Sequence, residues 1–360
     1  MILKKIMVNM RDKGYEVYID NELKNLYYFI EEYKSSGNIF IITDDIVSSI
    51  YGDIIDQIEK KFKCKTWVLE HGEKNKSLDT VKKIYDFLLE NNATRNSTII
   101  GFGGGIVGDV AGFAASTYMR EISFINVPTT MLSQIDSCIG GKVGFNYNGI
   151  KNLIGSFFNP KFVYVCPVLL KSLSRKQFKD GLGELIKYAL IDSREFLNYI
   201  DSNFEKIISK DEEVLLYIIE KCLSIKRDVV TQDFRDTGLR NILNFGHTVG
   251  HAIEVSSNFD ISHGEAVALG SLAAIKLSEY KFNISGNVYD FVVKLLERLE
   301  LPVTYKINDY DSFLSTIGHD KKNDLNIRFV LLEDIGKCKI KIDVEKDEIV
   351  KALKESIDVL

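Results

Sequence analysis

Several residue types are scarce in this sequence, and each scarcity excludes a class of protein. Only 4 of the 360 residues are proline, which argues against collagen-like and proline-rich disordered chains. The five cysteines are scattered and include no C-x-x-C pair, which favours reduced thiols over a disulfide framework or a zinc ribbon. With 45% hydrophobic and 27% charged residues, the chain is expected to fold around a sizeable core, in about two domains.

The sequence also lacks a long apolar run. Its longest stretch without Asp, Glu, Lys or Arg, residues 122–135, is interrupted by Asn126, Pro128 and Gln134. It is shorter than the roughly 18 apolar residues of a membrane span. Residues 1–10 have neither the apolar run nor the cleavage site of a secretory signal. We therefore expect no membrane span and a cytoplasmic protein.

Positive charge is not concentrated anywhere in the chain. The net charge is −5, and no tract of Lys and Arg forms a basic stripe. A surface for nucleic acid or for an anionic membrane therefore has little electrostatic basis. Any anionic ligand must instead be bound by cations that the fold gathers locally.

The first half of the chain alternates short β-rich runs with longer helical patterns. Apolar residues recur at three- and four-residue spacing over 47–58 and 78–88, as on the buried face of a helix. These helical stretches alternate with predicted strands at residues 39–43, 66–69, 98–101 and 122–127. Such an order predicts βαβ units and a Rossmann-like α/β domain with a mostly parallel, doubly wound sheet.

From about residue 168 onward, helical patterns dominate. The long helical periods cover 214–230, 265–279 and 288–299. Strand signals recur mainly at 327–332 and 339–342. We therefore expect an α/β domain over 1–165 and a mainly α-helical domain over 166–360. Because pockets often lie between domains and at the carboxyl ends of parallel strands, the chemistry is expected in the cleft.

A glycine-rich loop follows the predicted strand at 98–101. Residues 103–109 (GGGIVGD) satisfy the pattern G-x-G-x-x-G and open a helical pattern, so their amides could hold a pyrophosphate at a helix N-terminus. A tight turn from strand to helix would use the same glycines. The next strand carries no carboxylate for a ribose, and Asp44, at the end of strand 39–43, is the better candidate.

Three of the five histidines lie within seventeen residues. His247 and His251 are one helical turn apart, and His263 follows in the sequence Ser-His-Gly-Glu. With a carboxylate such as Glu184, two histidines could form the open two-His, one-carboxylate site of a catalytic divalent metal. Helix-surface or capping histidines would give the same pattern, and spacing alone would also admit His251 as a ligand.

Several cations lie in glycine-rich or helical surroundings. They are Lys142, Lys151, Lys187, Lys226, Arg240, Lys321 and Lys322. Any one of them taken alone is best explained as a solvated surface residue. Gathered in one cleft, however, Arg forks and Lys ammoniums would bind a small, multiply anionic substrate such as a phosphorylated acid.

These motifs, in this order, resemble the 3-dehydroquinate synthase family. The likeness runs from about residue 40 to about residue 330 and so covers most of the chain. Its most specific motifs are GGGIVGD at 103–109, VPTT at 127–130, DSCIGGK at 136–142, GIKN at 149–152, GLGELIK at 181–187, LNFGHTVGHAIE at 243–254 and HGE at 263–265.

The resemblance implies an enzyme of the shikimate pathway, in aromatic amino acid biosynthesis. Such an enzyme binds NAD and one divalent metal, zinc or cobalt, and converts 3-deoxy-D-arabino-heptulosonate 7-phosphate into 3-dehydroquinate and phosphate. In this family an alcohol is oxidised by NAD, phosphate is eliminated, and the NADH just formed reduces the ketone before an aldol step closes the ring. Residues 1–165 would bind NAD, residues 166–360 would bind the metal and the substrate, and a homodimer is typical.

The resemblance also implies roles for individual residues. The implied metal ligands are Glu184, His247 and His263. The implied catalytic residues are His251, as a proton relay, with Lys142, Lys187, Arg120 and Asn152. The implied substrate-binding residues are Lys151, Lys226, Arg240, Asn244, Lys321 and Lys322. Nucleotide contacts are implied for Asp44, Glu73, Lys76, Gly104, Gly105, Asp109, Thr129, Thr130 and Asp136, and also for Lys142 and Lys151.

The loss of phosphate needs a base, and no lone carboxylate of the sequence is an obvious one. The resemblance suggests that the substrate's own phosphate takes the proton while the protein positions it. Among the positions that depart from the family pattern, Asp236 replaces a frequent glutamate and shortens an acidic arm in the substrate-proximal stretch.

Three other functions remain open from the sequence. A sister sugar-phosphate cyclase, such as 2-deoxy-scyllo-inosose synthase or a valiolone-type synthase, would share the fold, cofactor and metal. A carboxylate-bearing substrate, by contrast, calls for four side chains that are all present, Lys142, Lys226, Arg240 and Asn244. A metal-dependent polyol dehydrogenase would release NADH, and its reaction would not explain the motifs that contain Lys142 and Lys151. A catalytically dead regulatory subunit would not need the intact histidines.

Overall fold

The chain divides into two structural units. The computed structural model describes residues 4–9, 14–285, 287–318 and 327–359. Unit 1 comprises Met1–Leu173 and Leu215–Arg227, and unit 2 comprises Ser174–Val214 and Asp228–Leu360. Helix α8 (Glu212–Gln232) thus contributes its central part to unit 1, although the residues before and after that part belong to unit 2. The assignment of functional domains to 1–165 and 166–360 stays a prediction.

Unit 1 is built on a sheet whose described strands have the order β1-β2-β9-β6-β5-β3-β4. The strands are β1 (Lys4–Val8), β2 (Tyr15–Ile19), β3 (Ile39–Asp44), β4 (Lys65–Leu69), β5 (Thr98–Gly103), β6 (Ser123–Pro128) and β9 (Phe162–Val165). β1 pairs antiparallel with β2. All the other neighbours in this order, β2–β9, β9–β6, β6–β5, β5–β3 and β3–β4, are parallel. The predicted parallel, doubly wound sheet is confirmed.

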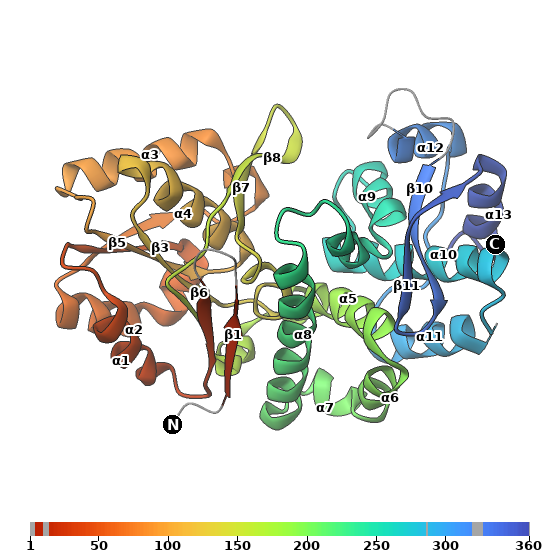
Figure 1. Ribbon diagram of the computed structural model, residues 1–360, viewed down its shortest axis with the longest axis horizontal. Coiled ribbons are helices and arrows are strands. Elements are labelled where there is room, and N and C mark those ends of the chain that lie inside the picture. The colour runs from red at the N-terminus through yellow and green to blue at the C-terminus, as the bar shows by residue number, and fades with distance from the viewer. Residues whose placement is uncertain (1–3, 10–13, 286, 319–326, 360) are drawn as a thin grey trace. The chain divides into compact units, whose positions relative to one another are not determined.

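Helices cover both faces of this sheet (Figure 1). They are α1 (Leu26–Tyr33), α2 (Asp45–Phe62), α3 (Leu78–Glu90) and α4 (Gly105–Thr117). Because successive side chains of a strand point to opposite faces, Ile41 of β3 packs into the core under α1 and α2. Its neighbours Phe40 and Ile42 pack into the second core, under α3 and α4. The alternating strands and helices therefore enclose two apolar layers.

Unit 1 also carries a hairpin that the sequence patterns do not predict. β7 (Lys142–Tyr147) pairs antiparallel with β8 (Ile150–Phe157), and the register shifts between Phe145 and Tyr147. The first six residues of β8 are exposed, so this strand lacks the apolar alternation of a half-buried strand. Short turns of 3-10 or π-helix complete the unit at η1 (Leu23–Asn25), η2 (Glu73–Asn75), η3 (Tyr118–Arg120), η4 (Ser133–Ser137) and η5 (Pro167–Ser172).

Unit 2 is mainly helical, as predicted. Its elements are α5 (Arg175–Asp192), α6 (Arg194–Ser202), α7 (Phe204–Ile208), η6 (Leu239–Asn244), α9 (His247–Ser256), α10 (His263–Phe282), α11 (Asn287–Arg298), α12 (Tyr310–Gly318), α13 (Lys346–Ser356) and the antiparallel hairpin of β10 (Ile327–Asp334) and β11 (Lys337–Val344). Most of α10 is buried, and it contacts α5, α9, α11, α13 and β10. Among the described residues, no helix combines the length and apolarity that crossing a membrane requires.

Candidate active site

Glycines let helices of unit 2 approach one another closely. Where α5 meets α10, a Cβ atom on Gly183 would lie 1.8 Å from the carbonyl oxygen of Gly264, and one on Gly264 would lie 1.6 Å from that of Asp180. A side chain larger than hydrogen therefore does not fit at either position. Glu184 and His263 are the chain neighbours of these glycines, so the crossing places the two residues next to each other.

A second close approach joins the start of α9 to α10. Gly246 has a left-handed φ of 78°, and a Cβ atom on Gly270 would lie 2.0 Å from the carbonyl oxygen of Gly246. His247 follows Gly246 as the first residue of α9. Each predicted metal ligand therefore adjoins a glycine at which two segments of unit 2 meet.

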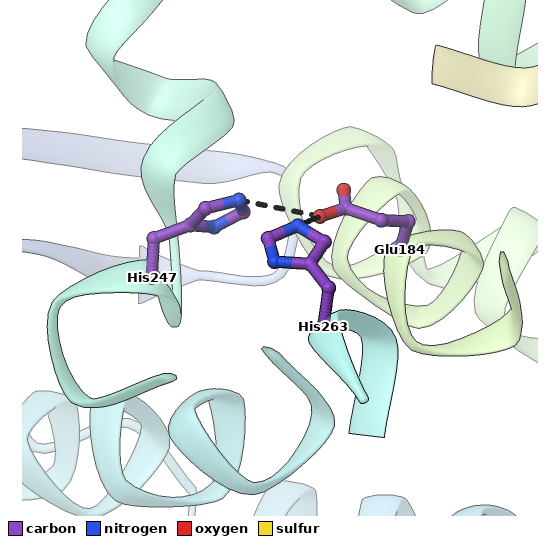
Figure 2. Close-up of side chains that lie close together, drawn as sticks. All are labelled: Glu184, His247 and His263. Carbon is purple, nitrogen blue, oxygen red and sulfur yellow. Dashed lines mark ion pairs between the residues drawn. The ribbon is translucent and has the colours of Figure 1, made fainter. Parts of the chain in front are cut away.

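Glu184, His247 and His263 form a compact group (Figure 2). One carboxylate oxygen of Glu184, Oε1, lies 3.2 Å from Nε2 of His247 and 3.3 Å from Nε2 of His263. The three ligand atoms all lie within 4.8 Å of one another. The side chain of Glu184 is 1% exposed and that of His263 is 30% exposed. The group is thus buried at its carboxylate and accessible at one imidazole.

Hydrogen bonds on the far side of each imidazole decide which nitrogen faces Glu184. Nδ1 of His247 lies 3.2 Å from the carbonyl oxygen of Phe245, and Nδ1 of His263 lies 3.2 Å from Oε2 of Glu254. A carbonyl and an ionised carboxylate only accept, so both Nδ1 atoms donate and carry a proton. In the neutral form that binds a metal, each ring therefore has its lone pair on Nε2, beside Glu184. Two imidazoles and a carboxylate presented in this way fit a divalent metal such as zinc.

A buried lysine balances the charge of this group. Burial by itself would raise the pKa of Glu184, but the ammonium of Lys187 and the ring of His247 hold that pKa well below its usual range. Lys187 contacts Oε2 of Glu184 from three residues further along α5, and its side chain is 2% exposed. Glu184 is therefore ionised, as a metal ligand must be.

The metal-free protein is expected to lose stability as the pH rises. Burial by itself would lower the pKa of His263, but hydrogen bonds to Glu184 and Glu254 raise it from 6.5 to about 10. The folded state therefore holds this proton more tightly than the unfolded chain. The resulting stabilisation is fully present below about pH 6.5 and disappears as the pH rises through about 10. Melting temperatures of metal-stripped protein would show this decrease. His263→Asn should flatten the profile, and an unchanged slope in that variant would contradict the assignment.

Glu254 is expected to strengthen metal binding through His263. Its buried carboxylate accepts from Nδ1 of that ring, and such partners of ligating histidines typically change metal affinity by about 10–100-fold. Glu254→Gln keeps an acceptor but removes the charge, so zinc affinity, measured by competition with a chelator, should fall within that range. The matched control is Glu265→Gln, since Glu265 caps α10 by accepting from Ser262. Equal zinc affinities in the two variants would show that the carboxylate of Glu254 does not tune the ligand.

His251 lies one turn after His247 on α9 and is exposed. Its ring centre is 5.4 Å from that of His247 and 6.2 Å from that of His263. Ligand atoms of His251, Glu254 and His263 also lie within 4.8 Å of one another. This position beside the three-residue group is compatible with a proton relay, a role that stays a prediction.

A carboxylate that the sequence interpretation missed organises the loop before α9. Oδ2 of Asp233 accepts the backbone N–H groups of Gly238 at 2.7 Å and Arg240 at 3.0 Å. The backbone N–H of Thr237 contributes most to lowering the pKa of Asp233, and with the other two hydrogen bonds it brings that pKa to about 2. Arg240, a predicted substrate contact, is 3% exposed and donates from Nη1 to the carbonyl oxygen of Phe234. An Asp shortly before Thr-Gly is a loop-capping signal that could have been found in the sequence.

The glycine loop of unit 1 lies at the carboxyl ends of β5 and β6. Gly104 precedes α4, and Gly105 is its first residue. The backbone N–H of Thr129 donates to the carbonyl oxygen of Gly103 at 2.9 Å, and a Cβ atom on Gly104 would lie 3.1 Å from Cγ2 of Thr130. The loop and both threonines are therefore adjacent. The N-terminus of α4 has no side-chain cap, so its backbone amides can bind a pyrophosphate.

Asp44 ends β3, which pairs with β5 in the sheet. Its carboxylate caps α2 by accepting the backbone N–H of Val47 at 2.8 Å, and burial raises its pKa. Its contact with a ribose stays a prediction. A pocket beside the glycine loop is lined by Gly104, Gly105, Asp109, Asn126, Cys138 and Lys142, among others.

Two of the predicted nucleotide-binding carboxylates of unit 1 are paired with buried lysines. Nζ of Lys76 lies 2.5 Å from Oδ2 of Asp109 and also donates to Oδ1 of Asn152. Nζ of Lys226 lies 3.0 Å from Oδ1 of Asp136 and 2.7 Å from its carbonyl oxygen. The structure thus brings these five predicted residues into two hydrogen-bonded groups, in which the lysines are already held in place.

Other predicted site residues lie at the surface. The exposed ones are Glu73, Arg120, Lys142, Lys151 and Asn244. Asp236, the shortened acidic residue, accepts a hydrogen bond from Nδ2 of Asn241 at 3.1 Å. Lys321 and Lys322 lie outside the described residues.

Comparison with known proteins decides the family. The family model described as 3-dehydroquinate synthase N-terminal matches residues 66–180, and the one described as 3-dehydroquinate synthase C-terminal matches residues 181–323. The chain belongs to the 3-dehydroquinate synthase family. The resemblance drawn from the sequence motifs, and with it the prediction of an enzyme, is confirmed.

Members of the 3-dehydroquinate synthase family match nearly the whole chain. The 3-dehydroquinate synthase of Clostridium tetani is 53% identical over 349 residues, which are 96% of this chain and 94% of that protein. The 3-dehydroquinate synthase of Acetivibrio thermocellus is 38% identical over 98% of this chain and 99% of its own length.

A solved sister cyclase has the same fold. A crystal structure of 2-deoxy-scyllo-inosose synthase, complexed with carbaglucose-6-phosphate, NAD+ and Co2+, superposes with a TM-score of 0.87. It covers 98% of this chain and 100% of its own, at 26% identity. The identity of 53% to a 3-dehydroquinate synthase therefore favours that family over the sister cyclase.

Proposed function

We propose that this protein converts 3-deoxy-D-arabino-heptulosonate 7-phosphate into 3-dehydroquinate and phosphate, with NAD and one divalent metal, zinc or cobalt. One observation carries the proposal: in a chain of the 3-dehydroquinate synthase family, Nε2 atoms of His247 and His263 meet the ionised carboxylate of Glu184. The NAD+ and Co2+ bound by the related 2-deoxy-scyllo-inosose synthase support the same cofactors here.

The metal centre is assigned to Glu184, His247 and His263. A metal held there would lower the pKa of the substrate hydroxyl that is to be oxidised. The carbonyl of Phe245 and the carboxylate of Glu254 fix the two rings, so the ligands are oriented in advance. His251, which lies beside this group, would take up and return a proton.

The nucleotide site is assigned to the carboxyl ends of β3, β5 and β6. The loop at Gly104 and Gly105, with Thr129 and Thr130, would hold the pyrophosphate of NAD. NAD would accept a hydride from the substrate alcohol and return it in a later step. Asp44 would bind a ribose of the same cofactor.

The substrate carries a carboxylate and a phosphate, and the cations present suit both. The planar fork of Arg240 matches a carboxylate, and its loop is held by Asp233. Arg120, Lys142 and Lys151 are exposed cations that suit a phosphate. The proposal includes a homodimer, which rests on the family resemblance and which sedimentation of the purified protein would test. It also includes the cytoplasmic location that the sequence patterns predict.

The test uses metal-stripped protein with the heptulosonate phosphate and sub-stoichiometric NAD, with and without zinc or cobalt. Phosphate and 3-dehydroquinate should be released in equal amounts, only with metal, and with many turnovers per NAD. Accumulation of NADH without phosphate would show a dehydrogenase instead. No reaction with this substrate, but phosphate release from glucose 6-phosphate, would show a sister cyclase.

A further inference from the structure

The β7–β8 hairpin carries residues that are proposed to contact the substrate, Lys142, Lys151 and Asn152. Its pairing is interrupted between Phe145 and Tyr147, and Asn146 lies at this interruption. The backbone of Asn146 pairs elsewhere: its N–H donates to the carbonyl oxygen of Lys76 at 2.8 Å, and it forms a parallel bridge with Ser77. Because a bulge redirects one residue of a strand, the hairpin is joined to the segment that precedes α3.

The side-chain amide of Asn146 uses both of its ends. Nδ2 donates to Oε1 of Glu73 at 2.8 Å, and Oδ1 accepts the backbone N–H of Asn152 at 2.8 Å. Asn152 has a left-handed φ of 54°, a conformation that interrupts a regular strand and that asparagine adopts more readily than most residues. One amide therefore connects the turn η2 to the left-handed residue of β8.

Lys76 makes a second connection between the same segments. Its ammonium, which is buried, pairs with Asp109 on α4 and donates to Oδ1 of Asn152. Asp109 stands one turn into the helix that the glycine loop opens. Asn152 is thus held at its backbone through Asn146 and at its side chain through Lys76.

We propose that Asn146 is a positioning residue that couples NAD binding to the substrate-binding hairpin. This inference rests on the proposed function and on two roles that the family resemblance implies, a nucleotide contact for Glu73 and a catalytic role at the substrate for Asn152. A nucleotide that orders the turn also orders Asn152 through the amide of Asn146, so less ordering remains when the substrate binds. By thermodynamic linkage, each ligand then raises the affinity for the other by the same factor.

Three variants separate this role from a general effect on folding. Asn146→Asp keeps an oxygen for Asn152 but puts a second carboxylate against Glu73 in place of the donor. The double variant with Glu73→Gln and Asn146→Asp restores the hydrogen bond in the reverse direction, because Gln donates and Asp accepts. Asn148→Asp is the matched control: it adds the same charge in the same hairpin, and Asp-Gly suits a two-residue turn as well as Asn-Gly.

Two readouts apply to the full-length protein. One is the affinity for NAD, by calorimetry, with and without a saturating, unreactive phosphonate analogue of the substrate. The other is hydrogen exchange of residues 146–157 on addition of NAD alone. In the wild type and Asn148→Asp, the analogue should tighten NAD binding at least about five-fold and NAD should protect 146–157. In Asn146→Asp that factor should fall below about two and the protection should vanish, while the double variant recovers most of both.

Equal coupling factors in Asn146→Asp and Asn148→Asp would overturn the inference. So would a wild-type protein without coupling, or a loss of stability in Asn146→Asp with an unchanged factor. If NAD binds and residues 146–157 respond but no 3-dehydroquinate is formed, only the proposed function fails. If NAD does not bind the wild-type protein, both fail.

Discussion

Glu184→Gln should abolish metal binding and turnover, and it should also destabilise the metal-free protein. The carboxylate is 1% exposed and contacts the 2% exposed ammonium of Lys187. Removing the charge of Glu184 breaks this buried ion pair, which typically costs about 3–5 kcal/mol. Bound zinc, by atomic absorption, should fall to background. The value of kcat should fall at least about a thousandfold, in line with the several kcal/mol that a catalytic metal supplies.

A double variant separates the two effects of Glu184→Gln. With Lys187→Met added, the buried ammonium beside position 184 is removed as well, and methionine fills a similar volume. Chemical denaturation should then show most of the lost stability restored, while zinc binding stays absent. If the double variant is as unstable as the single one, the lost ion pair is not the cause. If Glu184→Gln alone still binds zinc with wild-type affinity, Glu184 is not a ligand.

The parts of the fold that the sequence predicts are those whose buried residues form a periodic pattern or a continuous apolar run. In β3, Phe40, Ile41 and Ile42 are all buried because helices cover both sides of the sheet, and this gives a continuous apolar run. The β7–β8 hairpin has no such run, since Ile150, Leu153 and Ile154 are exposed apolar residues without alternation. The membership of residues 215–227 in unit 1 depends on long-range contacts, which no local pattern encodes.

The candidate metal ligands were only partly predictable from spacing. Spacing alone predicts His247 and His251 equally well as ligands, and only the family resemblance favours His247. The structure gives a physical reason for the difference: His247 follows Gly246, at a close contact with α10, whereas His251 is exposed one turn later. The carbonyl of Phe245, which fixes a ring, has no sequence signal at all because every residue has a carbonyl.

Other positioning residues were missed for a related reason. Glu254 contacts His263 on another helix, and Asn146 contacts Glu73, which is distant in the sequence. Only the folded chain shows these two contacts. Glu254 lies three residues after His251 on α9, and that helical spacing was the one signal that could have drawn attention to it. Asn146 left no comparable signal, because its partner Glu73 is 73 residues away in the sequence.

Gly264→Ala should both destabilise unit 2 and remove the metal. Its Cβ atom would lie 1.6 Å from the carbonyl oxygen of Asp180, a backbone atom that cannot rotate away. Helices α5 and α10 must therefore separate, and overpacking of this kind typically costs about 1–3 kcal/mol and occasionally more. Glu184 and His263 would move apart with their helices, although a metal site tolerates errors of only about 0.2 Å in its distances. We expect a lower denaturation midpoint and no bound zinc.

Gly52→Ala is the matched control for this substitution. Gly52 lies in α2 directly after the kink at Tyr51, and a Cβ atom there would meet nothing within 4 Å. Alanine should therefore stabilise the protein by about 0.5–1 kcal/mol through its better helix propensity, and zinc content should stay unchanged. A loss of stability in Gly264→Ala and a gain in Gly52→Ala would show that the effect comes from the close helix crossing and not from an added methyl group as such. The crossing would then be what keeps Glu184 and His263 close together. Wild-type zinc content in Gly264→Ala would show instead that the two ligands do not depend on the helix crossing.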